Sequence, residues 1–369
     1  MTDAEQQLTA VREQIDAIDR QIQSLINQRA VCAQKVAEIK KAALEASASD
    51  TGSGVQYYRP EREAQVLRGV MERNEGPLPP KQVAHIFREI MSSCLALEHP
   101  LRVAYLGPEG TFTQQALQKH FGHAVSGLAL SGIGDVFEQV ERGEADYGVV
   151  PVENSTEGMV AHTLDSFMQS SVQICGEVEL PISLHLLAKE QDAEITRICA
   201  HQQALAQSRT WLEHHYPSVE LLAVSSNAEA ARMAAEDATL AAVAGEIAMD
   251  RYALVPLARN IQDLAANTTR FLIIGRERIK PSGRDKTSVV VSTRNKPGAL
   301  YNILAPFQKA GLSLTRIDSR PSRTETWSYL FFIEFEGHAD TPEVGRVLSE
   351  LEEHTSMLKR LGSYPQAAI

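Results

Sequence analysis

One arginine interrupts an apolar heptad pattern close to the N-terminus. A guanidinium is always charged, and burying it without a partner is costly. Two interpretations are open for Arg29: its aliphatic stem covers the seam while its head reaches water, or it holds an anionic ligand inside a helical core. Alternating steps of three and four residues give the seam Leu8, Val11, Ile15, Ile18, Ile22, Leu25, Arg29, Cys32, Val36 and Ile39.

Further charged residues accompany this seam. Arg12 and Lys40 lie 28 residues apart, which is four heptads, so they share one flank of the helix. At 1.5 Å per residue they are roughly 42 Å apart, too far for one small ligand to touch both in one chain. An antiparallel partner would bring its own Arg12 beside Arg29 and Lys40. Glu63 falls on the apolar stripe of a second helix, and together these charges predict a site for a compact dianion that carries a hydroxyl.

The elements that must position these charges are helices. The period of 3.5 residues predicts a coiled-coil-like helix from about Thr2 to Ala43. A second helix opens at Pro60, which suits a first turn, and a third spans about Pro80 to Glu98. Three helices of unequal length cannot bury such a long seam, so we expect a partner chain.

After Pro100 the pattern changes to alternating strands and helices. This alternation continues to about Gly275 and predicts a mostly parallel sheet, in two lobes with a crossover near Leu180. A basic linker follows, and the order β-α-β-β-α-β then predicts a ferredoxin-like α+β domain. We therefore expect a multidomain protein with boundaries at 1–99, 101–279 and 285–369.

The overall composition excludes several classes of protein. A chain of 369 residues with 43% hydrophobic and 22% charged residues is typical of globular proteins, and its net charge of −11 argues against nucleic acid as a partner. No apolar run reaches the ~20 residues that cross a bilayer, and the polar start predicts no secretory signal. The four cysteines are scattered, which favours reduced thiols in a cytoplasmic protein. The sequence has no clustered metal ligands, and we expect neither metal nor cofactor.

The helical segment resembles a known enzyme family. Residues 8–98 are similar to the all-helical chorismate mutases, and the resemblance implies rearrangement of chorismate to prephenate in an intertwined dimer. It also implies that Lys40 donates to the ether oxygen, where negative charge grows as the C–O bond breaks. The positions that match the family's substrate-binding residues are Arg12, Arg29, Lys40, Arg62 and Glu63.

Two positions depart from the pattern of that family. Arg59 stands where an aspartate is common, and Glu98 stands where a glutamine faces the ether oxygen. A carboxyl group can donate there only when protonated, and burial beside an anion raises its pKa. We therefore expect Glu98 to be a catalytic contact and the mutase to be more active at mildly acid pH.

Three polar motifs sit at the ends of predicted strands in the middle segment. They read GPEGTFT, PVENSTEG and NTTRF. Each alone fits turn and capping chemistry, and backbone N–H groups at the first also suit a carboxylate. Together they resemble prephenate dehydratase over about residues 101–279. The resemblance implies a two-lobed fold like that of bilobal binding proteins, with prephenate between the lobes losing water and CO2 to give phenylpyruvate.

The resemblance also assigns roles in this segment. Thr269 matches the catalytic threonine, and Glu153 is the rival acid. Arg270 holds a substrate carboxylate or forms a structural ion pair, and the sequence leaves both open. The expected substrate contacts are Thr111, Asn154, Ser155, Gln207, Thr268 and Arg270.

The C-terminal motifs NKPGALYNIL and TRIDSRPSR resemble those of the ACT domain. The resemblance implies that phenylalanine binds between paired ACT domains and inhibits the dehydratase of a homodimer, with pairing into tetramers left open. Two alternative functions remain open. The middle and C-terminal domains could form a ligand-binding sensor without catalytic activity, or the helical domain could serve only for dimerisation while the dehydratase stays active. The expected phenylalanine contacts are Gly298, Ala299, Leu300, Asp318, Ser319, Arg320 and Pro321.

Overall fold

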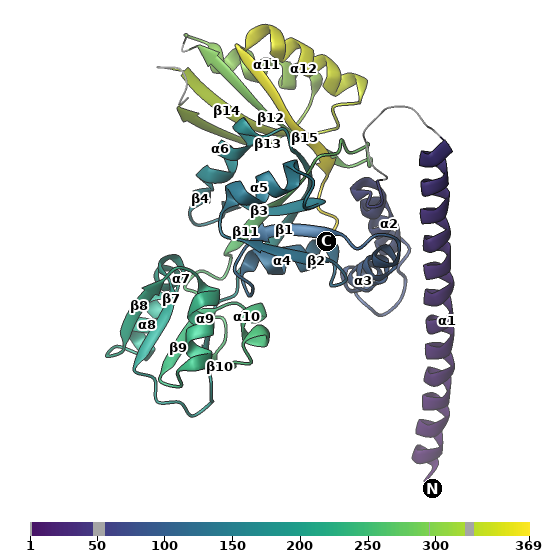
Figure 1. The fold of residues 1–369 in the computed structure, drawn as a ribbon, viewed down its shortest axis with the longest axis vertical. Coiled ribbons are helices and arrows are strands. Elements are labelled where there is room, and N and C mark those ends of the chain that lie inside the picture. Colours follow the sequence, from purple (N-terminus) through teal and green to yellow (C-terminus); the bar gives the residue numbers. More distant parts are fainter. Residues whose placement is uncertain (1, 47–55, 295, 322–327) are drawn as a thin grey trace.

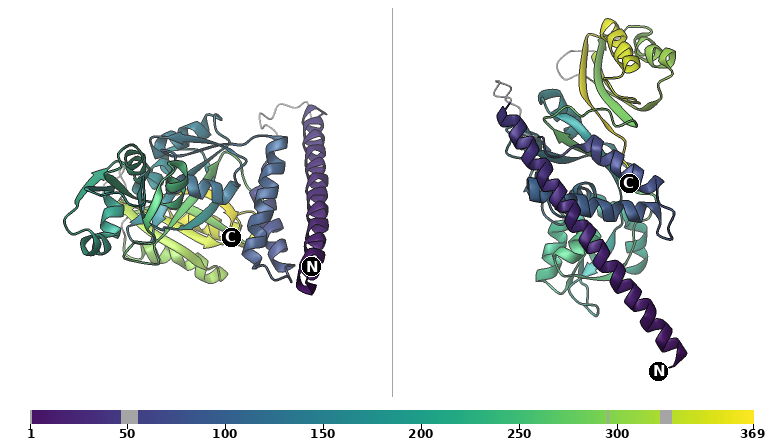
Figure 2. Two further views of the ribbon diagram at one scale, coloured as in Figure 1. Left: turned by 90° about the horizontal axis from the view of Figure 1, so that it is seen from below. Right: turned by 90° about the vertical axis from the view of Figure 1, so that its right-hand side faces the viewer.

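The computed structural model describes residues 2–46, 56–294, 296–321 and 328–369. Its N-terminal part is helical, with α1 at Asp3–Ala46, α2 at Pro60–Glu72 and α3 at Pro80–Glu98. Helix α1 packs on α3 and stands at the edge of the molecule, with α2 and α3 between it and the rest (Figures 1 and 2). All three predicted helices are confirmed, and a proline opens both α2 and α3, as expected at a first helical turn.

The apolar seam of α1 faces solvent in the single chain. Its isoleucines and leucines are about half exposed or more, with Leu25 at 62% and Ile39 at 68%. A contiguous exposed apolar stripe of this length is unusual for a monomer. The other two helices cover only a short part of α1 near Ala37, which is buried.

The first lobe of the middle domain has a sheet in the order β2-β1-β3-β11-β5, with the short β4 beside β3. Helices α4, α5 and α6 accompany it (Figure 1). The elements are β1 at Arg102–Leu106, α4 at Phe112–Phe121, β2 at Ser126–Leu130, α5 at Ile133–Glu141, β3 at Tyr147–Asn154, β4 at Gly158–Met159, α6 at Ala161–Gln169, β5 at Gln173–Pro181 and β11 at Thr268–Gly275.

The second lobe has the strand order β10-β6-β9-β7-β8. The chain enters it after β5 and returns through β11, so two crossings join the lobes. The elements are β6 at His185–Ala188, β7 at Arg197–His201, α7 at Gln202–Gln207, α8 at Arg209–His215, β8 at Glu220–Val224, α9 at Asn227–Glu236, β9 at Leu240–Ala244, α10 at Glu246–Arg251 and β10 at Val255–Ala258.

The expectation of mostly parallel sheets was wrong. In the first lobe β1 pairs in parallel with β2 and β3, but β11 runs antiparallel between β3 and β5. In the second lobe β6 pairs antiparallel with both β9 and β10. The cause is the double crossing, because a strand that returns from the other lobe enters the first sheet from the opposite end.

The C-terminal domain has the predicted β-α-β-β-α-β order and a four-stranded sheet, β13-β14-β12-β15. Helices α11 and α12 pack on one face (Figure 1). The other face packs on the first lobe, where Val290 and Phe332 join Val150 and Leu272 in one apolar cluster. The elements are β12 at Asp285–Arg294, α11 at Ala299–Ala310, β13 at Leu314–Pro321, β14 at Ser328–Glu336, α12 at Pro342–His354 and β15 at Met357–Pro365.

Candidate functional sites

Lys40 lies near the C-terminal end of α1, against the chain that leads into α2. Its Nζ donates to the carbonyl oxygens of Gln56 and Tyr57, each at 3.2 Å. Burial lowers the pKa of Lys40; the Glu98 carboxylate opposes this effect, and the nearby charge of Arg59 adds to it. The positive charge of Arg59 therefore disfavours the charged form of Lys40.

Glu98 completes a small group of charges with Lys40 and Arg29. Burial raises the pKa of Glu98, and the positive charges of Lys40 and Arg29 act in the opposite direction. The raised pKa agrees with the direction expected from the sequence. The structure thus brings three of the predicted mutase residues from α1 and α3 within electrostatic reach of one another.

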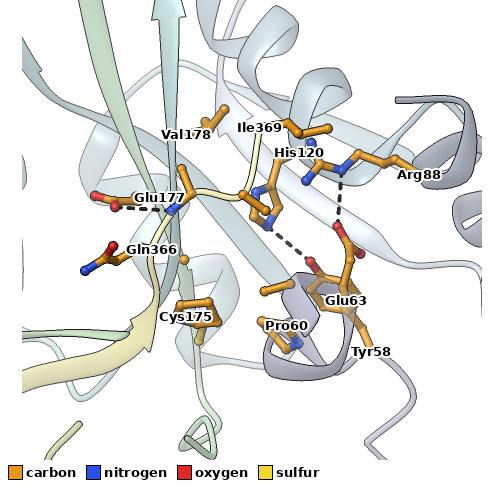
Figure 3. A pocket seen from close by; sticks show the side chains of 15 residues that line it. Tyr58, Pro60, Glu63, Arg88, His120, Cys175, Glu177, Val178, Gln366 and Ile369 are labelled. Carbon is orange, nitrogen blue, oxygen red and sulfur yellow. Dashed lines mark hydrogen bonds and ion pairs between the residues drawn. The ribbon is translucent and has the colours of Figure 1, made fainter. Parts of the chain in front are cut away.

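The other predicted mutase residues lie elsewhere in the single chain. Arg12 is exposed and lies 17 positions before Arg29 on the same helix, which separates the two by roughly 26 Å. Arg62 is exposed on α2. Glu63 contacts Arg88 at 3.2 Å rather than facing Lys40, which differs from the expectation because its part of α2 faces the first lobe (Figure 3).

Sequence reasoning missed a polar cluster at this helix–lobe junction. The ring Nε2 of His120 lies 3.1 Å from the hydroxyl of Tyr58 (Figure 3). Arg88 donates to the carbonyl oxygen of Lys119 at 2.7 Å. Burial and the charge of Arg88 lower the pKa of His120 to about 3, so the ring is neutral at physiological pH. No sequence pattern links these residues, since they come from four separate segments.

The middle domain holds a closed network of amides and hydroxyls. Asn154 Nδ2 donates to Thr269 Oγ1 at 2.8 Å and to Asn267 Oδ1 at 3.1 Å. Asn267 Nδ2 donates to Gln207 Oε1 at 2.9 Å, and Gln207 Nε2 donates to Thr156 Oγ1 at 3.0 Å. Thr156 in turn donates its backbone N–H to Asn154 Oδ1 at 3.0 Å. The network joins the first lobe to α7 of the second lobe.

A β-bulge sets which side chains enter this network. Asn154 pairs with Thr269 and Glu153 pairs with Arg270, but the pairing then skips Val152. An extra residue in one strand changes the alternation of its side chains. Asn154 therefore shares a face with Thr269, whereas Glu153 and Arg270 lie on the opposite face, toward the C-terminal domain.

Two sequence expectations change as a result. Glu153 pairs with Arg316 of β13, so its carboxylate faces away from Thr269 and is not the acid beside it. Arg270 is 6% exposed and donates to Glu334 of β14 at 2.7 Å, with Glu177 at 3.5 Å. This geometry favours the structural ion pair and leaves Arg270 unavailable for a substrate carboxylate.

Electrostatics agrees with this account of Arg270. Burial alone would lower the pKa of Arg270, but the hydrogen bonds and negative charge of Glu334 raise it. Burial would raise the pKa of Glu334, and the hydrogen bonds and charge of Arg270 lower it instead. Both groups are held in their charged forms by each other.

Three further predicted substrate contacts, Thr268, Ser155 and Thr111, lie near the network. In the part of the chain that the structure describes, they make no hydrogen bond to its side chains. Thr268 donates its backbone N–H to Ser155 Oγ at 3.0 Å, which closes the turn between the two strands. Thr111 immediately precedes α4, and its hydroxyl donates to the carbonyl oxygen of Leu106 at 3.2 Å instead of capping the helix. These side chains shape turns in the structure.

The C-terminal domain has a hollow of about 350 Å³ between the start of α11 and the neighbouring strands. Gly298, Ala299, Leu300 and Ser319 line it, as expected. Gly298 has a φ of 80°, in the left-handed region that favours glycine. The other lining residues are Thr293, Lys296, Tyr301, Tyr329 and Phe331.

The second predicted phenylalanine motif is divided between two faces of β13. Arg320 donates to the carbonyl oxygen of Ala161 at 3.1 Å and pairs with Asp165 at 3.4 Å, so it faces the first lobe. Strand alternation places Asp318 on that same face, and Pro321 does not line the hollow. The expectation that all these residues surround one ligand is not met in the single chain.

The described residues contain no cluster of three or more histidine, cysteine or acidic side chains that could hold a metal. None of the described helices is long and apolar enough to cross a membrane. The helical domain, the two-lobed domain and the C-terminal α+β domain thus define an enzyme with two candidate sites for small organic acids and a third domain suited to an effector.

Comparison with known proteins identifies the three parts. Residues 11–99 match chorismate mutase type II, residues 103–279 match prephenate dehydratase, and residues 287–353 match the ACT domain. The chain is 53% identical to the bifunctional chorismate mutase/prephenate dehydratase of Pseudomonas aeruginosa over 98% of its own length and 99% of that protein. It is 52% identical to the corresponding protein of Stutzerimonas stutzeri, over the whole of both chains.

A solved structure extends the comparison. The prephenate dehydratase from Arthrobacter aurescens, in complex with L-Phe, is 35% identical and has a TM-score of 0.66, covering 72% of this chain and 90% of that one. The chain belongs to the family of bifunctional chorismate mutase/prephenate dehydratases. It is an enzyme of phenylalanine biosynthesis with both activities, and its ACT domain fits feedback inhibition by phenylalanine.

Proposed function

We propose that each chain carries one complete dehydratase site and only part of a mutase site. The observation that supports this most directly is the closed network around Asn154 and Thr269, which lies within one chain. We place the domain boundaries at 1–99, 101–279 and 285–369, and the enzyme in the cytoplasm as a homodimer that is able to pair further into a tetramer.

The dehydratase reaction is centred on Thr269. Prephenate loses its ring hydroxyl as water while the ring carboxylate leaves as CO2, and the electrons of the broken C–C bond complete the aromatic ring. Asn154 donates to Thr269 Oγ1, so the hydroxyl proton of Thr269 points elsewhere and can hydrogen-bond the departing oxygen. An alcohol is a poor acid; Thr269 therefore acts by donation or by relaying a proton. Gln207, Ser155, Thr268 and Thr111 contribute the surrounding polar surface.

The mutase reaction needs charges from two chains. A pericyclic rearrangement requires no nucleophile or metal; it requires the substrate held folded and donors aimed at the ether oxygen. Lys40, Arg29 and protonated Glu98 provide these groups from one chain. Arg12 of a second chain completes the site when the exposed seams of two α1 helices pack antiparallel, and Arg62 lies at the rim.

Phenylalanine binds in the hollow of the ACT domain. Gly298 and Ala299 offer backbone groups at a helix start, and the aromatic rings of Tyr329 and Phe331 offer apolar surface. The L-Phe complex of the dehydratase from Arthrobacter aurescens supports this ligand. Binding lowers dehydratase activity because phenylalanine favours one of two states of the enzyme.

Ultraviolet absorbance tests the whole proposal in one vessel. Purified enzyme with chorismate should form prephenate and then phenylpyruvate, and added phenylalanine should slow the second step. Accumulation of prephenate without phenylpyruvate would contradict the dehydratase assignment. Stable chorismate, with added prephenate still consumed, would instead contradict the mutase assignment.

A further inference from the structure

The two strands that carry Asn154 and Thr269 are each tied to the regulatory domain one residue away. Glu153 precedes Asn154 and pairs with Arg316 of β13. Arg270 follows Thr269 and pairs with Glu334 of β14. The bulge in β3 places Glu153 on the same face as Arg270, toward the ACT sheet, while Asn154 and Thr269 lie on the opposite face.

Arg316 contacts both strands of the β3–β4 hairpin. Its guanidinium pairs with Glu153 of β3 and lies 3.1 Å from the sulfur of Met159 in β4. Glu153 and Met159 are themselves opposite each other in the pairing of these two strands. The turn that joins the strands holds Asn154 and Thr156, both members of the polar network. One side chain of the ACT domain therefore clamps the base of the turn that forms half of the dehydratase site.

Several ion pairs cross this interface, including Arg320 with Asp165, and the charge of Arg316 also acts on Glu334. Arg270 is neutralised by Glu334 and Glu177, and Lys286 also contacts Glu177 at 2.8 Å. Arg316 is the ion-pair partner of Glu153, and both side chains are about three-quarters buried. Removing Arg316 would leave the largely buried Glu153 carboxylate without its ion-pair partner at the base of the turn, which favours movement of the turn toward water.

We propose that Arg316 is a positioning residue for the dehydratase reaction: through Glu153 and Met159 it holds the β3–β4 turn so that Asn154 stays hydrogen-bonded to Thr269. The same strand, β13, carries Ser319 in the effector hollow three residues farther on. A ligand that shifts β13 therefore shifts the clamp, which links the hollow to the network without a contact between ligand and network. This inference rests on the proposed roles of Asn154 and Thr269.

The test compares Arg316→Met, Arg316→Lys, Glu153→Gln and the Arg316→Met/Glu153→Gln double variant in the full-length enzyme. Arg316→Met should lower dehydratase kcat by about 10- to 100-fold, because small displacements of a positioned group cost rates of this order. KM for prephenate and mutase kcat should stay close to wild type. Arg316→Lys keeps the charge and should recover most of the loss, and Glu153→Gln should be milder than Arg316→Met because an amide oxygen still accepts from Arg316.

Lys359→Met is the matched control. Lys359 also reaches from the ACT sheet to the first lobe, where its Nζ donates to the carbonyl oxygens of Phe167 and Ser170, each at 2.7 Å, but it does not touch the β3–β4 hairpin. This variant should leave dehydratase kcat unchanged. If it loses as much activity as Arg316→Met, general loosening of the interface explains both and the proposal fails.

The double variant separates positioning from direct chemistry. If Arg316 acts through Glu153, the double variant should be no worse than Arg316→Met. Losses that multiply, a normal kcat in Arg316→Met, or a Glu153→Gln variant more damaged than Arg316→Met would each overturn the proposal. Failure of the proposed site itself has a different signature, namely a Thr269→Ala enzyme that still dehydrates prephenate.

Discussion

The mutase and dehydratase regions handle successive forms of one dianion with opposite designs. In the mutase region charged side chains on long helices lie beside an exposed apolar seam, and Arg12 is far from Arg29 and Lys40. In the dehydratase region neutral amides and hydroxyls satisfy one another in a closed network within one chain. The proposed mutase site needs a second chain, whereas the proposed dehydratase site lies within one chain.

The difference follows from the chemistry of each step. The rearrangement moves charge toward an ether oxygen without any proton transfer, so it is served by cations and donors around the substrate. The dehydration needs one well-placed donor near a leaving hydroxyl, and hydrogen-bonded neutral groups place such a donor with little desolvation cost.

The largest expected effect separates the two regions within one molecule. Thr269→Ala should lower dehydratase kcat by about 10²- to 10⁴-fold, the range for loss of a general acid or donor. Mutase kcat, followed by loss of chorismate absorbance, should be unchanged. Thr269→Ser keeps a hydroxyl next to Asn154 and should retain much of the activity. Equal loss in the serine and alanine variants would indicate that the methyl group, and not the hydroxyl, matters.

Mixing variants tests whether a site is shared between chains. Arg12→Gln and Lys40→Gln should each lower mutase kcat by about 10²- to 10³-fold. When the two are co-expressed, half of the dimers are mixed and each mixed dimer has one intact site, so about a quarter of wild-type mutase activity should return. Co-expression of Thr269→Ala with Asn154→Ala should recover no dehydratase activity, because both residues serve the same chain. Absence of mutase recovery would contradict an antiparallel pairing of α1.

The pH dependence of the mutase sharpens the comparison further. The pKa of Glu98 is raised by burial, so the protonated, donating form persists to higher pH than in an ordinary glutamate and is lost as the pH rises through that pKa. Mutase kcat should therefore fall by about tenfold between pH 5 and 8. Glu98→Gln donates at every pH and should flatten the profile, while the dehydratase profile of the same variant should match wild type. An unchanged mutase profile in Glu98→Gln would remove Glu98 from the chemistry.

Much of the fold could be predicted from the spacing of apolar residues and from the prolines and glycines that begin and end elements. The helices α1 to α3 and the βαββαβ domain were predicted to within a few residues, because their apolar spacing and prolines act locally. The direction of β11 could not be predicted in this way. It depends on where the chain re-enters a sheet after passing through another lobe, which is a property of the crossings rather than of the strand's own residues.

Sequence motifs predicted several residues of the candidate dehydratase site. They could not predict the bulge in β3, where one extra residue changes which side chains face the site. Asn154 and Thr269 come from two of the quoted motifs, Gln207 lies outside them, and all three join one network. Glu153 is one residue from Asn154, and only the bulge at Val152 decides that it faces Arg316 instead of the substrate side. Glu63 shows the same limit, since its stripe on α2 contacts another domain that helical periodicity alone does not reveal.

The smallest expected effect concerns His120, which lies where the helical domain packs against the first lobe of the dehydratase domain. His120 has its pKa lowered to about 3, whereas in the unfolded chain the pKa of histidine is about 6.5. The unfolded chain therefore binds more protons between these values, and stability falls as the pH drops below about 6.5. With allowance for the partial exposure of the ring, the loss at pH 5 relative to pH 7.5 should be about 1 kcal/mol, or about 2 °C in the unfolding temperature.

His120→Gln removes this titration while keeping a hydrogen-bonding side chain opposite Tyr58. The difference in unfolding temperature between wild type and His120→Gln should shrink or reverse as the pH falls from 7.5 to 5. A constant difference for His120→Gln would show that folding does not lower the pKa of His120, and would contradict the effect of its burial beside Arg88.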